Sequence, residues 1–170
     1  MGIALDVLTY QDVLLTIRGS QSDTSGDDER VIELMVEGRI YRDEPHVYLT
    51  YEESDLSGVE GVQTMLDVEG ERVTLYRTGE IRTSMVFEEG RRYQSVYETP
   101  LGRMQMGIFP NSVYSSVDGE EGEVALHYQL DFGGRFIGNN TLSVTYRPCG
   151  SKDMVKTEYM QVQQQTGMIS

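Results

Sequence analysis

Apolar and polar residues alternate along most of this chain, and a turn signal interrupts the alternation about every ten residues. The clearest stretch runs over residues 124–132, where every second residue is apolar. Its apolar face holds Val124, Leu126, Tyr128, Leu130 and Phe132. A period of two is typical of a strand with one buried face and one solvent-facing face. No stretch before the C-terminal tail has a helical period, so the pattern predicts an antiparallel all-β protein.

Ten such stretches are separated by short turns, several of which contain glycine. They cover residues 12–20, 31–41, 46–53, 62–68, 73–77, 80–88, 91–98, 103–114, 123–132 and 136–147. Short connections with glycine, such as Gly133-Gly134, are those of antiparallel hairpins. A long twisted meander tends to close, because closure removes its two exposed edges. We therefore predict a single antiparallel β-barrel of about ten strands, whose interior is either filled by side chains or holds one small ligand.

The 170 residues suit one domain. The alternation defines a barrel domain over residues 12–148, preceded by an N-terminal extension, residues 1–11. Residues 149–170 form a polar C-terminal tail with several glutamines, for which we expect either frayed chain or a helix.

Composition excludes several classes of partner. The net charge of −14 argues against binding to nucleic acid or to an anionic membrane, because both need clustered positive charge. The single cysteine, Cys149, cannot form an internal disulfide, which fits a reducing compartment. The first residues have neither a basic leader nor a long apolar run. We therefore expect a cytoplasmic protein.

Several short motifs together resemble a known family. They are Arg-Thr-Gly at 77–79, Phe-Glu-Glu-Gly-Arg at 87–91, Tyr-Glu-Thr-Pro-Leu-Gly at 97–102, Leu-His-Tyr-Gln-Leu at 126–130 and Asn-Asn-Thr-Leu-Ser-Val at 139–144. In this order and spacing they resemble the YwiB-like family of small bacterial proteins, over roughly residues 12–147. The resemblance implies a calycin-like β-barrel, related in shape to lipocalins and fatty-acid-binding proteins. It implies no activity, substrate or catalytic residue, and Phe109-Pro110 departs from the family pattern.

Arg77 is the most suggestive single side chain. It shares strand parity with Val73 and Leu75, so a regular strand would point it into the barrel near one end. A guanidinium in that position needs a partner, because an unpaired buried charge is very costly. Arg77 could bind a ligand carboxylate. Alternatively, it could donate hydrogen bonds to backbone carbonyls or pair with an acidic residue where the barrel closes. The sequence leaves both roles open.

Four tyrosines form a second candidate group. Strand parity would aim several of them inward, where rings supply wall area and hydroxyls supply polar handles. They are Tyr51, Tyr93, Tyr97 and Tyr128. Such a set suits a pocket with a few placed polar groups. It equally suits an ordinary core whose tyrosine hydroxyls reach the rims.

We find no catalytic residue, metal site or cofactor motif. His46 and His127 lie in no metal-ligand pattern, and His127 falls on the solvent-facing side of its strand. Nucleophile, phosphate-loop and dinucleotide motifs are absent. The sequence therefore favours a non-enzymatic barrel that binds a small apolar or acidic-headed molecule in its interior. The alternative is a protein-interaction module with a filled barrel, using an outer face or the acidic segment 52–61; an unrecognised enzyme is the third option.

Overall fold

A computed structural model describes residues 8–23, 29–52, 61–149 and 158–162, the last of these as backbone alone. These parts contain eleven strands and no helix. The strands are β1 (Tyr10–Ser22), β2 (Glu29–Asp43), β3 (His46–Glu52), β4 (Gln63–Glu69), β5 (Arg72–Thr78), β6 (Thr83–Phe87), β7 (Tyr93–Thr99), β8 (Gly102–Ser116), β9 (Gly122–Phe132), β10 (Arg135–Pro148) and β11 (Glu158–Val162). The first ten coincide, in order, with the ten predicted strands.

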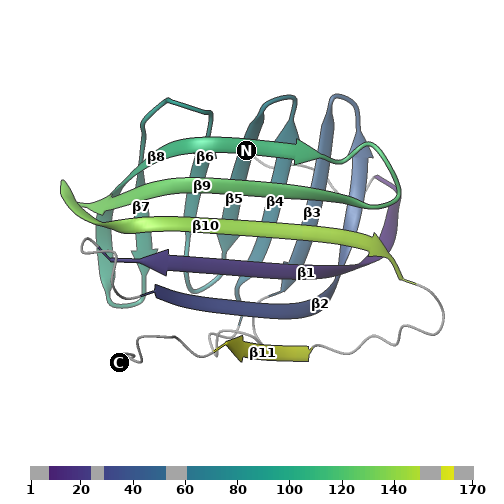
Figure 1. Cartoon of the computed structure of the whole chain (residues 1–170), viewed down its shortest axis with the longest axis horizontal. Coiled ribbons are helices and arrows are strands. Elements are labelled where there is room, and N and C mark those ends of the chain that lie inside the picture. The colour runs from purple at the N-terminus through teal and green to yellow at the C-terminus, as the bar shows by residue number, and fades with distance from the viewer. Residues whose placement is uncertain (1–7, 24–28, 53–60, 150–157, 163–170) are drawn as a thin grey trace.

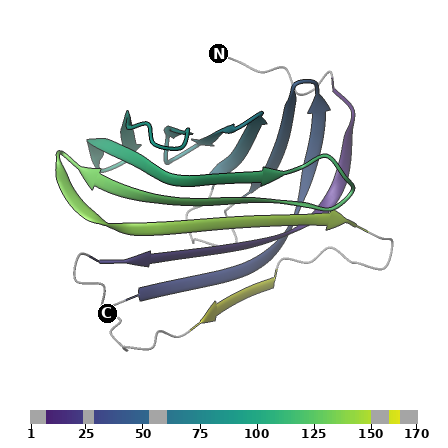
Figure 2. The same cartoon turned by 45° about the horizontal axis from the view of Figure 1, so that its top comes forward.

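The strands form one antiparallel sheet that curls into two crossed layers. Neighbours follow the order β6-β5-β4-β3-β2-β1-β10-β9-β8-β7. In Figure 1, β3 to β7 stand upright at the back, while β8, β9, β10, β1 and β2 cross them in front. The turned view in Figure 2 shows the front strands curving over the rear layer. The predicted all-β fold, a single antiparallel barrel that is nearly closed, is confirmed.

The two longest strands, β2 and β8, belong to both layers. Each has 15 residues. β2 pairs with β1 over Glu29–Tyr41 but with β3 over Arg39–Asp43 alone. At the start of that change lies Gly38, where a Cβ would collide with the backbone oxygen of Thr50 and the side chain of Leu15. β8 similarly pairs first with β7 and then with β9, and its register shifts between Pro110 and Ser112. A bulge is a position at which a strand tolerates both proline and a bend.

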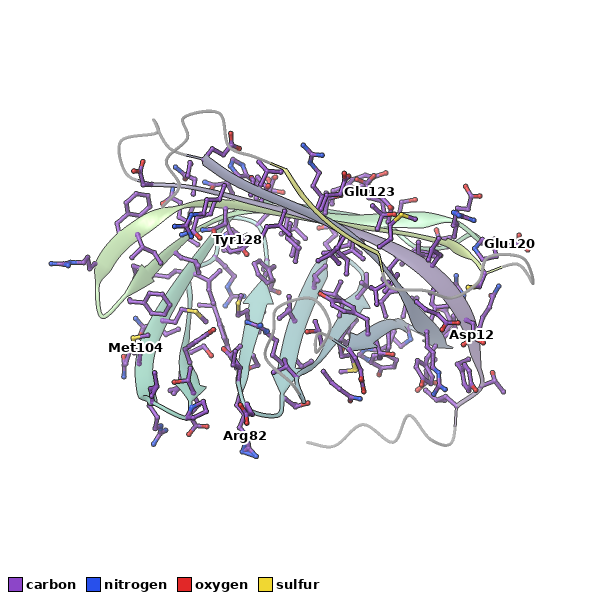
Figure 3. All side chains as sticks on the ribbon, turned by 90° about the horizontal axis from the view of Figure 1, so that it is seen from below. Asp12, Arg82, Met104, Glu120, Glu123 and Tyr128 are labelled. Atoms are coloured by element: carbon purple, nitrogen blue, oxygen red, sulfur yellow. The ribbon has the colours of Figure 1, made fainter. Side chains whose placement is uncertain are left out.

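The middle of the barrel is filled by apolar side chains from both layers. Seven residues from seven different strands have no solvent-accessible surface: Leu15, Leu49, Leu66, Val73, Phe87, Ile108 and Val144. Figure 3 shows the side chains of the two layers meeting between the ribbons. The alternation predicted for residues 124–132 is visible here, with Leu126 buried and His127 exposed. Any ligand site therefore lies toward an end or a side of the barrel, away from this centre.

Beyond the barrel, β11 lies beside β2 in both views (Figures 1 and 2). Its residues pair with Val31–Met35, the part of β2 that β3 has left. A strand thus occurs inside the predicted polar tail, although no alternation indicated it. No helix in the described residues is long and apolar enough to cross a membrane. Most of the acidic segment 52–61 lies outside the described residues.

Candidate functional site at the seam between β6 and β7

A row of polar side chains lies at one end of the apolar interior. Tyr51, Thr64, Arg77 and Thr83 are successive cross-strand partners on β3, β4, β5 and β6. Two residues further along the same strands, the corresponding row is Leu49, Leu66, Leu75 and Met85, all of them buried. Because side chains two residues apart in a strand share a face, both rows point inward. The core therefore changes from apolar to polar at this end.

Thr83 carries the clearest unsatisfied group of the row. Its Oγ1 atom is buried and has no hydrogen-bond partner in the structure. A buried hydroxyl without a partner costs on the order of 1–3 kcal/mol, so each such group needs an explanation. Thr64 is more deeply buried, with 1 % of its surface exposed, but it does take part in polar or electrostatic interactions. Thr83 thus differs from Thr64, the threonine on the other side of Arg77 in the same row.

Arg77 interacts electrostatically with Tyr128 of the opposite layer. Burial raises the pKa of the Tyr128 hydroxyl to about 12, and the positive charge of Arg77 partly offsets that rise. The Tyr128 ring also packs edge-on against Phe87, with 4.9 Å between ring centroids. Arg77 is engaged in polar or electrostatic interactions of its own. The guanidinium and a buried tyrosine from β9 therefore share the same region of the barrel.

A cleft of about 560 Å³ opens beside this row, between β6 and β7. Two guanidinium groups line it, those of Arg77 and Arg82. Hydroxyl groups come from Thr78, Thr83, Ser84, Tyr93 and Ser95. The one carboxylate in the lining belongs to Glu98, whose Oε2 lies 3.2 Å from Nε of Arg103. Figure 3 places Arg82 at the outer edge of its layer and Tyr128 beneath the other.

The structure brings together some of the sequence-predicted site residues. Arg77 and Tyr93 line the cleft, and Tyr51 stands two strands away from Arg77 in the polar row. Tyr128 approaches through the interior. Tyr97 does not line the cleft, because its ring packs against Phe132 at a centroid distance of 5.9 Å.

Sequence reasoning missed Thr64, Thr83 and Arg82. The first two could have been found from parity, since Thr64 alternates in step with Leu66, and Thr83 with Met85. Arg82 gave no such signal, because it lies outside the regular part of its strand.

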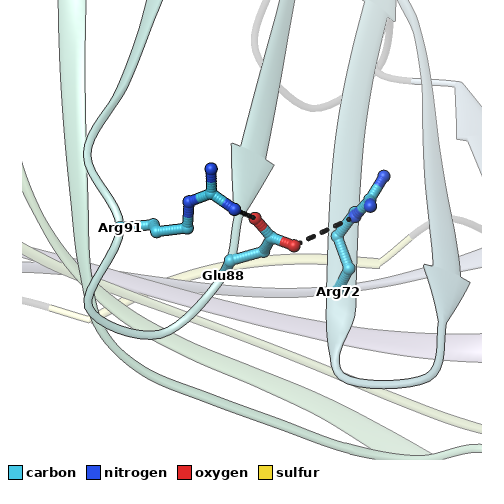
Figure 4. Close-up of polar contacts among 3 residues, drawn as sticks. All are labelled: Arg72, Glu88 and Arg91. Atoms are coloured by element: carbon cyan, nitrogen blue, oxygen red, sulfur yellow. Dashed lines mark hydrogen bonds and ion pairs between the residues drawn. The ribbon is translucent and has the colours of Figure 1, made fainter.

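A larger cleft, about 810 Å³, lies near the other ends of β5 and β6, and it has a different character. Its two arginines, Arg72 and Arg91, each lie 3.3 Å from Glu88, one on either side of the carboxylate (Figure 4). The guanidinium side chains are 52 % and 76 % exposed, so these pairs contribute little to stability. Glu69, Glu71 and Glu89 add further negative charge around the opening. An anion is therefore better served by the smaller cleft.

The described residues contain no group of three or more metal-ligating side chains. His46 instead pairs with Asp67 on the outer face, with 2.8 Å between Nδ1 and Oδ1. Its ring stacks on Tyr48. The hydrogen bond to Asp67 is the main cause that raises the pKa of His46 above its ordinary 6.5. This pair has one carboxylate and no further ligand, which leaves it as an electrostatic contact.

Comparison with known proteins assigns the chain to a family. Residues 15–144 match the family model described as a domain of unknown function, DUF1934. The chain belongs to the DUF1934 family. An uncharacterized beta-barrel protein of Bacillus subtilis (strain 168), YwiB, is 25 % identical to it over 137 residues, which is 80 % of this chain and 94 % of that protein. The predicted YwiB-like relationship is thereby confirmed.

The crystal structure of the YwiB protein from Bacillus subtilis has the same fold. It matches this DUF1934 chain with a TM-score of 0.76 at 22 % identity, covering 86 % of this chain and 99 % of the crystallised one. The likeness concerns architecture and assigns no activity to the DUF1934 barrel.

Proposed function

We propose that this DUF1934 barrel binds a small molecule with an anionic head group in the cleft between β6 and β7. The observation that carries the proposal is the gathering of Arg77 and Arg82 beside the buried, unsatisfied hydroxyl of Thr83. This gathering occurs in a chain whose net charge is −14. Positive charge concentrated at one cleft of an acidic protein suits a ligand of negative charge.

The chemistry of the lining favours a carboxylate or a similar oxyanion. A guanidinium can donate two parallel hydrogen bonds to such a group, and hydroxyl groups can donate further ones. Among the described residues, the side chain of Arg82 forms no ion pair, so its charge is available at the opening. The hydroxyl of Thr83 belongs to the lining of the same cleft and has no hydrogen-bond partner in the structure. A bound ligand can supply that partner.

The remainder of the ligand should be apolar and small. The cleft also presents the ring of Tyr93 and the side chain of Val96, which is 37 % exposed. The fully buried centre of the barrel supplies no further room. An acid with a short hydrocarbon body therefore fits the lining better than a large lipid.

The first experiment compares head groups on one hydrocarbon body. Decanoate, decanol and decyltrimethylammonium are titrated into the protein by calorimetry, with amide NMR spectra recorded in parallel. We expect decanoate to bind more tightly than decanol and the cation to bind least at the cleft. Equal affinity for decanoate and decanol, or shifts at amides remote from β6 and β7, would contradict the proposal. Native mass spectrometry of protein purified from its own host then searches for a natural acid of this class.

Variants test the cleft residues without removing Arg77. Thr83→Val deletes the unsatisfied hydroxyl at nearly constant volume, and Arg82→Gln deletes the exposed charge. We expect each to weaken decanoate binding by about tenfold, which corresponds to ~1.4 kcal/mol. Arg135→Gln removes an exposed arginine from the first position of β10 and serves as the charge-matched control. If Arg135→Gln loses as much affinity for decanoate as Arg82→Gln, the loss is due to the change in net charge and not to the cleft.

A further inference from the structure

The barrel wall has few backbone hydrogen bonds along one line, between β6 and β7. These strands follow one another in sequence with residues 88–92 between them, yet they are the two ends of the sheet order. Two isolated bridges take the place of a ladder: Arg82, just before β6, bridges to Glu98 in β7, and Glu88 bridges to Arg91 within the connection. Every other pair of neighbouring barrel strands forms a ladder of at least five residue pairs. In the described chain, the β6–β7 seam is therefore the place where the wall has fewest backbone hydrogen bonds.

The Arg82–Glu98 bridge holds the outer end of this seam. The backbone N–H of Arg82 donates to the carbonyl of Glu98, and the N–H of Glu98 donates to the carbonyl of Arg82, both at 2.9 Å. Separating the strands here breaks two backbone hydrogen bonds, whereas separating any ladder breaks a longer row. Local openings in proteins begin where such bonds are few.

The cleft at the seam is lined by residues from both faces of the wall. Thr83 and Ser84 are neighbours on β6 and both line it, as do Ser95 and Val96 on β7. Adjacent residues of a strand point to opposite faces of the sheet. A cleft lined by both members of two such pairs therefore draws its lining from the outer and the inner face of the sheet. Its inner lining includes Arg77.

We infer that the seam between β6 and β7 is a lateral opening, through which solutes reach Arg77 and Thr83 from the side of the barrel. Entry of a ligand by this route rests on the proposed function, but the opening itself does not. The competing route enters at the barrel end and passes along the polar row. Thr64 distinguishes the two routes, because it lies in the same row but between the complete ladders of β3, β4 and β5.

Thiol labelling tests the opening without any ligand. In a Cys149→Ser background, Thr83→Cys and Thr64→Cys each introduce one thiol, at the seam and at the laddered control position. Their reaction rates with a thiol reagent are measured under native conditions and compared after correction for each variant's unfolding midpoint in urea. We expect the thiol at 83 to react at least about tenfold faster, since local opening precedes global unfolding. Equal corrected rates would overturn the inference.

A disulfide across the bridge tests entry of a ligand. Residues that exchange both backbone hydrogen bonds have Cα atoms about 5.5 Å apart, which suits a disulfide. Arg82→Cys with Glu98→Cys, again with Cys149→Ser, is compared in its oxidised and reduced forms, so that the substitutions cancel. We expect decanoate to associate at least about tenfold more slowly when the bridge is oxidised, by analogy with gated binding sites.

The two tests separate failure of the inference from failure of the proposed function. If decanoate associates equally fast with both forms, the lateral route is wrong while the binding proposal stands. If decanoate binds neither the wild type nor the reduced variant, the binding proposal fails, and the labelling rates alone decide whether the seam opens.

Discussion

Arg92 and Asp131 form an ion pair across the face of a glycine. The Nη1 atom of Arg92 lies 2.8 Å from Oδ2 of Asp131, joining the turn before β7 to β9. Between them on β8 is Gly107, which is buried and pairs with Gln94 on one side and Asp131 on the other. A Cβ at Gly107 would come within 2.8 Å of the guanidinium carbon of Arg92 and 2.5 Å of the carboxylate of Asp131. The pair thus occupies the space that a side chain at Gly107 would need.

Gly107→Ala should therefore lower stability. The added methyl group must displace the ends of these two side chains and weaken a partly exposed ion pair, so the substitution costs up to about 1 kcal/mol. The measurement is the free energy of unfolding from urea titration. Gly19→Ala is the matched control, because Gly19 also lies in a strand and its Cβ would meet only the backbone oxygen of Thr141, at 3.8 Å. We expect that control to be neutral or stabilised; an equal loss in both variants would contradict the steric reason.

The same ion pair predicts a loss of stability in acid. The hydrogen bond from Arg92 is the main cause that lowers the pKa of Asp131 below its ordinary 3.8. A carboxyl group whose folded pKa is lowered stabilises the fold fully above the ordinary pKa, and this contribution disappears as the pH falls through the folded pKa. Near neutral pH, the wild type should therefore have a higher urea unfolding midpoint than Asp131→Asn. This difference should shrink below about pH 4. A difference that is constant down to about pH 2 would rule out this linkage.

His46 predicts the opposite pH dependence. Because its hydrogen bond to Asp67 raises its pKa above 6.5, the contribution to stability is fully present below pH 6.5 and is lost as the pH rises through the folded pKa. NMR titration of the His46 ring should show a raised midpoint in the wild type. In Asp67→Asn the midpoint should fall back toward the ordinary value, and no change would show that another group sets it.

Thr83→Val and Thr64→Val should differ in their effect on stability. Thr83 loses a hydroxyl that has no partner, so the ligand-free variant should gain about 1 kcal/mol or stay unchanged. Thr64 is 1 % exposed and engaged in interactions, so its valine variant should lose about 1–3 kcal/mol. Both values come from urea titrations of the full chain in one buffer and at one temperature. A loss at Thr83 equal to that at Thr64 would show that its hydroxyl is satisfied in solution.

Arg77→Met should markedly destabilise the ligand-free protein. Arg77 has polar or electrostatic interactions in the barrel, one of them with the buried Tyr128. Removing this half-buried guanidinium leaves the polar groups that it contacts without their partner, which costs about 1–3 kcal/mol. An unchanged urea midpoint would assign Arg77 to ligand binding alone and leave no structural role for it.

The site was only partly predictable from the sequence. The inward direction of Arg77 followed from its parity with Leu75, because parity is a local property of any strand. That Thr64 and Thr83 flank it could not be read in the same way, since the partners of a residue depend on the register of neighbouring strands. Tyr97 shared the inward parity and lies between Val96 and Glu98, both of which line the cleft, yet its ring packs against Phe132 on β9.

The sequence by itself determined that the chain forms about ten barrel strands, and for residues 124–132 it determined which face is buried. These features arise from the alternation of side chains and from turn residues, both of which act over a few neighbouring positions. The tertiary structure alone decided that β2 exchanges β3 for β11 as its neighbour at Gly38, and that β6 and β7 meet through isolated bridges. Where a sheet bends and where its two ends meet depend on the twist and stagger accumulated over all of its strands, which no single stretch of sequence contains.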